Sequence, residues 1–165
     1  MLKTALVCGA FALALPVVAA AQPAPPAAEF VAKAGASDKF EVETGKLAET
    51  HGGSAAVKRF GRKMILDHAK STRLVKAAVA ASHMPAPPPP MLDGDQKGMI
   101  ADLQGKHGKD FDTTYIADQT KAHQAALDLM TAESTGGDNP HLKAAATKIV
   151  PVVKMHIAML QKMGG

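Results

Sequence analysis

A continuous helical seam near the end of the chain is the feature that most limits its fold. Residues at 142, 145, 149, 152, 156, 159 and 163 follow spacings of three and four without a break, and all but His156 are apolar. Positions at these spacings share one face of an α-helix, whereas a strand needs alternation with a period of two. Residues 57–74 and 116–130 carry the same pattern, and no segment alternates like a strand. The sequence therefore predicts an all-α fold.

Glycine and proline clusters divide the chain into helical segments. HGG at 51–53 ends the first segment, and Ser54 is a typical N-cap for the second. The proline run MPAPPPP at 84–90 cannot be helical and predicts a stiff link. TGGDNP then ends the third segment, and its Asp138 or Asn139 caps the fourth. The predicted helices cover, in order, 28–51, 54–83, 95–134 with an interruption at GKHG (105–108), and 138–163.

The lengths of the connections predict how the helices pack. Short turns join helices 1 and 2 and helices 3 and 4, so each of these pairs is antiparallel. The long proline-rich link allows helices 2 and 3 to run parallel, as in ferritin-like folds. We therefore expect one domain, residues 29–163, folded as a ferritin-like antiparallel four-helix bundle.

The start of the chain has the features of an export signal. Lys3 precedes a short apolar run, and Ala19-Ala20-Ala21 supplies a small-x-small cleavage pattern. The apolar run is shorter than the roughly 20 residues that span a membrane. We predict a cleaved Sec-type signal peptide over 1–21, a Pro/Ala tether over 22–28, and a periplasmic or secreted mature protein without a transmembrane span.

Composition indicates which covalent links and which kinds of partner the mature protein has. The one cysteine, Cys8, lies in the predicted signal, so the mature chain is held by its core without disulfides. The formal charge is +4, but there is no basic run and only one tyrosine, so we expect no nucleic acid partner. We expect a soluble protein, or at most one held peripherally at the envelope; its oligomeric state stays open.

Three stretches resemble a secreted bacterial family, domain-of-unknown-function family 4142, whose members are often labelled predicted outer membrane proteins. They are EVETGKLAETHGGSAAVKRFGRKMILDHAKS (41–71), FDTTYIADQTKAHQAAL (111–127) and IVPVVKMHIAML (149–160). The resemblance covers roughly residues 30–163. It implies a ferritin-like four-helix bundle in the periplasm and no established activity.

Three histidines are the candidate functional residues. His123 and His156 lie within apolar seams, and His68 lies beside one, directly after Asp67. Burying an unpaired polar group costs roughly 2–7 kcal/mol, so each imidazole needs a partner. Two explanations are open: hydrogen bonds within the core, or a shared metal ion. Asp67 can cap, orient the neighbouring imidazole, or pair with a lysine.

Height along the bundle favours the hydrogen-bond explanation. If helix 3 ends near Ser134 and helix 4 begins near Asp138, His123 and His156 differ in height by about seven residues, or ~10 Å at 1.5 Å per residue. That is too far for one ion unless the turn between the helices or a kink at Pro151 shifts the register. The expected partners are instead Asp38 or Glu41 for His68, and Asp112, Tyr115 or Gln119 for His156.

A metal site would draw one histidine from each of helices 2, 3 and 4 and a glutamate from helix 1, a donor set that suits zinc or another divalent ion. Its candidate ligands are Glu41, Glu43, His68, His123 and His156. Met159 and Met163 share a face with His156, and thioethers suit Cu(I), although methionine also serves as a core filler. Di-iron chemistry is disfavoured because no Glu-x-x-His occurs.

No arrangement of residues indicates catalysis. The chain has no Ser-x-x-Lys, no Gly-x-Ser-x-Gly and no phosphate-binding loop after a strand. We therefore expect a non-enzymatic periplasmic bundle protein, envelope- or stress-related, that requires no cofactor. The alternative is a protein that binds or sequesters a divalent metal, such as zinc, or copper.

Overall fold

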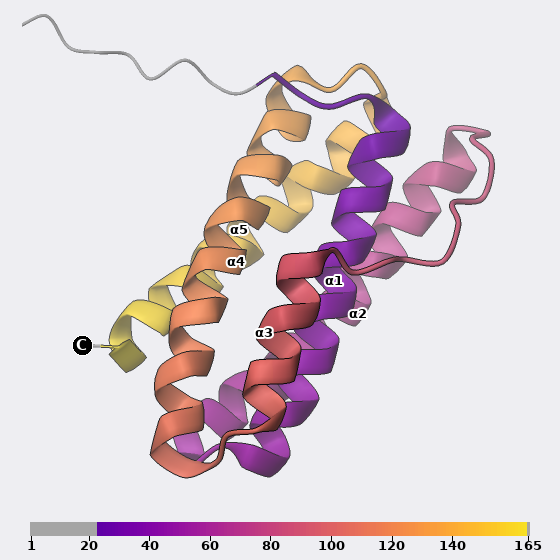
Figure 1. Ribbon diagram of the computed structural model, residues 1–165. Coiled ribbons are helices and arrows are strands. Elements are labelled where there is room, and N and C mark those ends of the chain that lie inside the picture. Colours follow the sequence, from indigo (N-terminus) through magenta and orange to yellow (C-terminus); the bar gives the residue numbers. More distant parts are fainter. Residues whose placement is uncertain (1–22, 165) are drawn as a thin grey trace, which may run out of the picture.

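The computed structural model describes residues 23–164, and all regular structure in this range is helical (Figure 1). The helices are α1 (Ala27–His51), α2 (Ala55–Ala81), α3 (Gly94–Gln104), α4 (Gly108–Gly136) and α5 (Pro140–Gly164). This confirms the predicted all-α class. The predicted signal peptide and the first residue of the predicted tether lie outside the described residues.

The predicted helix ends agree with the structure to within a few residues. The Ser54 hydroxyl accepts a hydrogen bond from the Val57 amide at 3.2 Å, as an N-cap does. Asn139, rather than Asp138, caps α5, because its side-chain oxygen accepts from the amides of His141 at 3.0 Å and Leu142 at 3.1 Å. The turn chemistry read from the sequence therefore places the helices correctly along the chain.

The four long helices form a ring. α1 packs on α2 and α4, and α5 packs on α4 and α2. In Figure 1, α2 and α4 both run upward while α1 and α5 run downward, so neighbours in the ring are antiparallel. The GKHG interruption is a reversal of direction and not a break within one helix: α3 runs down against α1 and α4, and the chain turns back at Gly108, whose φ is +61°.

A polar layer divides the core into two apolar clusters. On every long helix, buried polar residues fall between the buried apolar residues of one cluster and those of the other; Glu133 near the end of α4 is buried outside this layer. The upper cluster, near the start of α1, includes Phe30, Ala34, Val75, Met130 and Leu142. The lower cluster includes Val57, Phe60, Met64, Phe111 and Leu160. The polar layer consists of Asp38, Glu41, Thr44, His68, Ser71, Gln119, His123 and His156.

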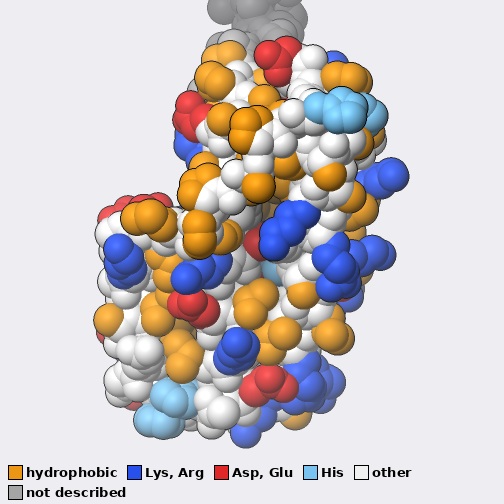
Figure 2. Space-filling model, turned by 90° about the vertical axis from the view of Figure 1, so that its right-hand side faces the viewer, with side chains coloured by type: hydrophobic (Ala, Val, Ile, Leu, Met, Phe, Trp, Pro, Cys, Tyr) orange, Lys and Arg blue, Asp and Glu red, His pale blue; other side chains and the backbone are white. Residues whose placement is uncertain are grey.

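The surface carries both signs of charge. Figure 2 shows Lys and Arg side chains over much of one face, interspersed with acidic and apolar ones, and histidines near its upper and lower ends. Within the described residues, no helix is long and apolar enough to cross a membrane.

The α1–α2 hairpin depends on a close contact between two glycines just below the polar layer. A Cβ atom built on Gly61 would lie 2.7 Å from the Gly45 carbonyl oxygen and 2.7 Å from the Ala48 Cβ atom. Real Cβ atoms do not approach other atoms so closely, so a side chain here would push the helices apart.

We predict that Gly61→Ala lowers the free energy of unfolding by about 1–3 kcal/mol, the usual cost of overpacking. The matched control is Gly98→Ala in α3, where a Cβ atom would meet nothing within 4 Å. That change should raise the free energy of unfolding by about 0.5–1 kcal/mol, because alanine loses less entropy than glycine in a helix. Urea unfolding of both variants measures the difference. Equal effects would contradict the close packing of α1 on α2.

Candidate metal centre

Three imidazoles meet in the polar layer, one from each of α2, α4 and α5. The side chains of His68, His123 and His156 are buried, with exposed fractions of 5%, 0% and 1%. One nitrogen atom of each ring lies within 4.8 Å of one nitrogen atom of each of the others. His123 Nε2 and His156 Nδ1 are 3.3 Å apart. The prediction that His123 and His156 are too far apart for one ion is therefore wrong.

The error lies in the turn between α4 and α5. Because α4 ends at Gly136 and α5 begins at Pro140, the two helices pair about residue 138, and not about residue 136 as the sequence suggested. This reduces the height difference between the histidines from about seven residues to about three, or ~4.5 Å along the helix axis. Imidazole side chains span the remaining offset.

The outer nitrogen of each ring is held by an oxygen atom that only accepts hydrogen bonds. His68 Nδ1 donates to Asp38 Oδ1 at 2.9 Å, and His156 Nε2 donates to Asp67 Oδ2 at 2.9 Å. His123 Nδ1 donates to the backbone carbonyl of Gln119 at 2.9 Å. Although burial raises the pKa of Asp67, its hydrogen bonds with His156 and Lys63 hold that pKa below its usual value. An ionised carboxylate and a carbonyl cannot donate, so each outer nitrogen carries the hydrogen.

This assignment leaves three lone pairs that face one another. In the neutral tautomers, His123 Nε2 and His156 Nδ1 are both acceptors, so no hydrogen bond joins them. His68 Nε2 has no hydrogen-bond partner among residues 23–164. Burial lowers the pKa of His123 to about 3 and that of His156 to about 4, so neither ring takes a second proton at neutral pH. The arrangement can therefore accept a cation at its centre.

His68 is the most basic of the three rings. Burial lowers its pKa, but the hydrogen bond with Asp38 and the charge of Glu41 outweigh this effect, so the pKa of His68 is raised above its ordinary value. A proton on His68 Nε2 therefore competes with a metal ion for the centre of the cluster.

Glu41 lies behind His123, outside the group of three inner nitrogens. Its side chain is 1% exposed, and Oε1 is 3.6 Å from His123 Nδ1. Neither of its carboxylate oxygens has a hydrogen-bond partner within the described chain. Burial raises the pKa of Glu41 from 4.5 to about 7. Above pH 7 the carboxylate therefore contributes negative charge to the site, and the nearby Gln119 side chain favours this ionised form.

The structure gives His156 a different partner from those predicted. Asp67 reaches it from α2, the other neighbour of α5 in the ring, whereas the sequence argument considered only α4. Asp112 instead accepts hydrogen bonds from the amides of Gly53 at 2.9 Å and Ser54 at 2.8 Å, and so supports the start of α2. The pairing of His68 with Asp38 is confirmed.

The remaining predicted residues surround the cluster or lie apart from it. Gln119 supplies its carbonyl to His123, and its Nε2 atom donates to Thr44 at 3.2 Å. Tyr115 stacks on Phe111 in the lower cluster, against which Met159 and Met163 also pack. Glu43 is partly exposed, lies 3.6 Å from the Lys39 amine, and does not join the histidines.

Phe60 contacts the site although the sequence did not indicate it as a site residue. Its ring centroid lies 6.1 Å from those of His123 and His156, and its ring forms an apolar floor.

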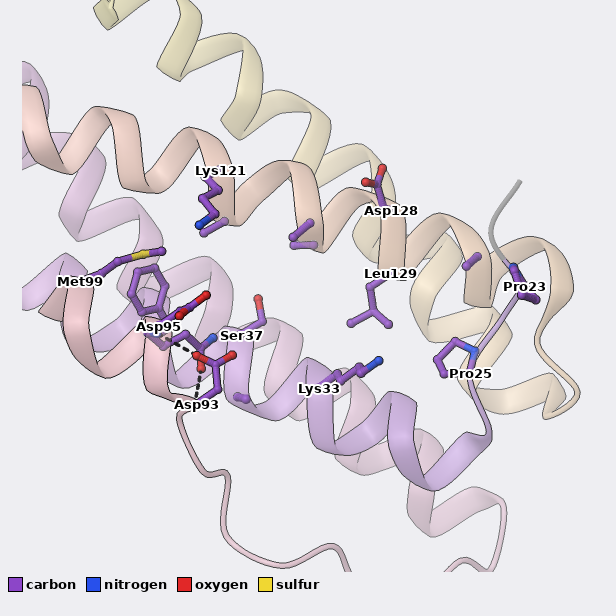
Figure 3. A pocket seen from close by; sticks show the side chains of 17 residues that line it. Pro23, Pro25, Lys33, Ser37, Asp93, Asp95, Met99, Lys121, Asp128 and Leu129 are labelled. Atoms are coloured by element: carbon purple, nitrogen blue, oxygen red, sulfur yellow. Dashed lines mark hydrogen bonds between the residues drawn. The ribbon is translucent and has the colours of Figure 1, made fainter. Parts of the chain in front are cut away.

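A surface groove of about 530 Å³ lies apart from the histidines, and no histidine of the cluster lines it. It lies between α1 and α4, where the short α3 leaves their seam uncovered, and Pro23 and Pro25 border one end of it (Figure 3). Phe40 and several alanines form its apolar lining, while Lys33 and Asp95 lie among its polar residues. It holds no convergent set of donors comparable to the three imidazoles.

Three convergent imidazole nitrogens form a donor set that suits a divalent transition metal. Zinc, copper and nickel ions all accept imidazole, and a site with three protein ligands leaves one position for water. The hydrogen bonds on the outer nitrogens fix the orientation of each ring and raise its basicity, as they do in known metal sites.

Comparison with known proteins identifies a family and a set of solved structures with the same fold. The family described as "Domain of unknown function (DUF4142)" matches residues 12–163, which confirms the resemblance found in the sequence. No curated protein matches the chain.

Three solved structures share the fold. CopM in its Cu(II)-bound form has a TM-score of 0.70 at 14% identity, over 86% of this chain and 97% of that one. CopM in its Cu(I)-bound form has a TM-score of 0.68 at 14% identity, over 84% and 94%. A secreted protein of family DUF305 from Streptomyces coelicolor has a TM-score of 0.69 at 15% identity, over 85% and 94%. At these identities the likeness shows a common fold and carries no function over.

The raised pKa of Glu41 predicts how stability depends on pH in the metal-free protein. The folded state holds this proton up to about pH 7, whereas the unfolded state releases it near pH 4.5. Ionisation of Glu41 therefore lowers the wild-type free energy of unfolding as the pH rises across that window. Glu41→Gln removes this effect. In chelator, the free energy of unfolding of the variant minus that of wild type should grow from pH 4.5 to 7.5, by at most about 3 kcal/mol. Urea unfolding at several pH values measures it, and a difference independent of pH would contradict the burial of an unpaired carboxyl.

Proposed function

Because the chain belongs to the DUF4142 family, whose description assigns no activity, we propose a function from its site. The protein is an exported metal-binding protein that holds one copper or zinc ion between His68, His123 and His156, on a ferritin-like helical bundle. The observation that carries this proposal is the convergence of three buried imidazole nitrogens whose hydrogens all lie on the outer side.

The energetics of the metal-free layer support a bound ion. Buried polar atoms without partners cost about 1–3 kcal/mol each, and native proteins keep few of them. Residues 23–164 contain eight such atoms, and six belong to the polar layer or to Tyr115 below it. A metal ion would give His68 Nε2 a partner and would turn the contact between His123 and His156 from repulsive to attractive.

The burial of the site supports sequestration over catalysis. The three imidazoles are at most 5% exposed, so a substrate has no open path to a metal-bound water. The nearest exposed member of the network is Asp67, whose side chain is 26% exposed and 3.1 Å from the Lys63 amine. An ion would enter past this pair, between α2 and α5.

Copper is supported by the fold of CopM, which is known in Cu(II)-bound and Cu(I)-bound forms. Export to the periplasm or the outside of the cell is supported by the signal pattern over residues 1–21 and by the secreted protein of the same fold. The competing function is a metal-free bundle whose histidines are structural, and the raised pKa of His68 favours it.

We predict that wild type binds one equivalent of Cu(II) or Zn(II) and that His156→Ala abolishes this binding. An ion present at 100 times its dissociation constant should raise the wild-type free energy of unfolding by ~2.7 kcal/mol. The matched control is His141→Ala, which removes an exposed histidine from the same helix and should leave the shift intact.

Thermal unfolding of the three proteins, with chelator and then with each metal, measures the shift. Stabilisation that survives in His156→Ala would place the metal elsewhere. An absence of stabilisation in wild type, together with a less stable His156→Ala variant, would select the structural role.

A further inference from the structure

We propose that the histidine site selects a dication over Cu(I), and that the buried charges of Glu41 and Asp38 set this preference. The inference rests on the proposed function and adds to it the oxidation state in which copper is held. It follows from the balance of charge in the polar layer and not from the ligands alone.

Two acidic side chains of the polar layer, Asp38 and Glu41, form no ion pair with a lysine or arginine of the described chain. Asp38 is 4% exposed and Glu41 is 1% exposed. Among the described residues, their only cationic-type neighbours are His68 and His123, and these two rings are neutral when their inner nitrogens bind a metal. The third carboxylate, Asp67, is partly exposed and paired with Lys63. Above pH 7, where Glu41 is ionised, two negative charges therefore remain uncompensated in the polar layer.

A dication balances this pair of charges, whereas Cu(I) leaves one of them uncompensated. Buried charge is costly unless it is paired, so the neutral arrangement is strongly favoured. The ligands act in the same direction, because three imidazoles without a thiolate or thioether lack the soft donors that favour Cu(I). Both effects predict that the protein binds copper as Cu(II), and that it binds Zn(II) in the same place.

Glu41 is the position at which charge can be separated from geometry. Asp38 orients His68 through a hydrogen bond and accepts another from Thr72 at 2.8 Å, so its removal would also disturb a ligand. Neither carboxylate oxygen of Glu41 has a partner within hydrogen-bonding geometry, although the Gln119 side chain lies near enough to lower its pKa. Glu41→Gln therefore keeps the shape of the side chain, removes its charge and leaves the hydrogen bonds on the three histidines in place.

The loss of one negative charge has a defined signature. Coulomb energy scales with the product of the charges, so the loss in the logarithm of affinity should be twice as large for Cu(II) as for Cu(I). Changes behind a metal ligand commonly weaken binding by 10- to 100-fold. We expect roughly 10- to 100-fold for Cu(II) and for Zn(II), and roughly 3- to 10-fold for Cu(I).

The same ratio fixes the reduction potential of the bound copper. Each tenfold loss of Cu(II) affinity relative to Cu(I) raises the potential by about 59 mV. Glu41→Gln should therefore shift the potential upward by roughly 30–60 mV. A redox titration of the copper-loaded protein measures this shift independently of the binding constants.

The experiment titrates wild type, Glu41→Gln and the control Glu49→Gln against competing chelators at pH 8, with Cu(II), Zn(II) and, without oxygen, Cu(I). The control removes the same charge from a partly exposed position on α1, where Glu49 lies 3.9 Å from Arg62, and should change no affinity. Asp38→Asn provides a second variant that should shift the Cu(II)/Cu(I) ratio in the same direction.

Each outcome separates the inference from the function on which it rests. A greater loss for Cu(II) than for Cu(I), with a raised potential, supports charge selection. Equal losses, or a potential that does not rise, would overturn it while leaving histidine-dependent binding in place. Wild-type binding that is unaffected by His156→Ala would overturn the proposed function itself.

Discussion

The hydrogen bonds on the outer nitrogens of three histidines are the constraint around which the core is organised. Asp38, Gln119 and Asp67 each hold one ring by an oxygen that cannot donate. Their geometry decides which nitrogen of each ring carries the hydrogen, and so directs three lone pairs to one point. A positive charge at that point, supplied by a metal ion or by a proton on His68, reduces the repulsion between these lone pairs.

The rest of the bundle keeps this layer in register. Apolar clusters above and below it span all four long helices, so neither end can slide without loss of packing. The close contact of Gly45 with Gly61 brings α1 against α2 near the layer, and Phe60 closes it from below. The layer itself contains unpaired carboxylate and amide oxygens, those of Glu41 and Gln119, and both residues are at most 1% exposed. Natural proteins accept such a cost mainly at functional sites.

The sequence predicted local structure well and tertiary register poorly. Helix ends followed from Ser54, Asn139 and the glycine and proline clusters, because caps and turns depend on neighbouring residues. The distance between His123 and His156 depended on the centre of one turn, and an error of two residues there doubled the predicted offset. The contact of Asp67 with His156 joins residues far apart in the chain through the packing of α2 on α5, which no periodicity reveals. Glu43 was a candidate metal ligand because it is a glutamate on the first helix. In the structure, however, its side chain lies against that of Lys39.

The central claim is that one ion is bound by all three histidines, and X-ray absorption spectroscopy of the protein loaded with one equivalent of Zn(II) tests it most directly. The account predicts three imidazole nitrogens at about 2.0–2.1 Å, with multiple-scattering features of the rings and one further light ligand. A shell dominated by oxygen atoms, with one imidazole or none, would contradict it.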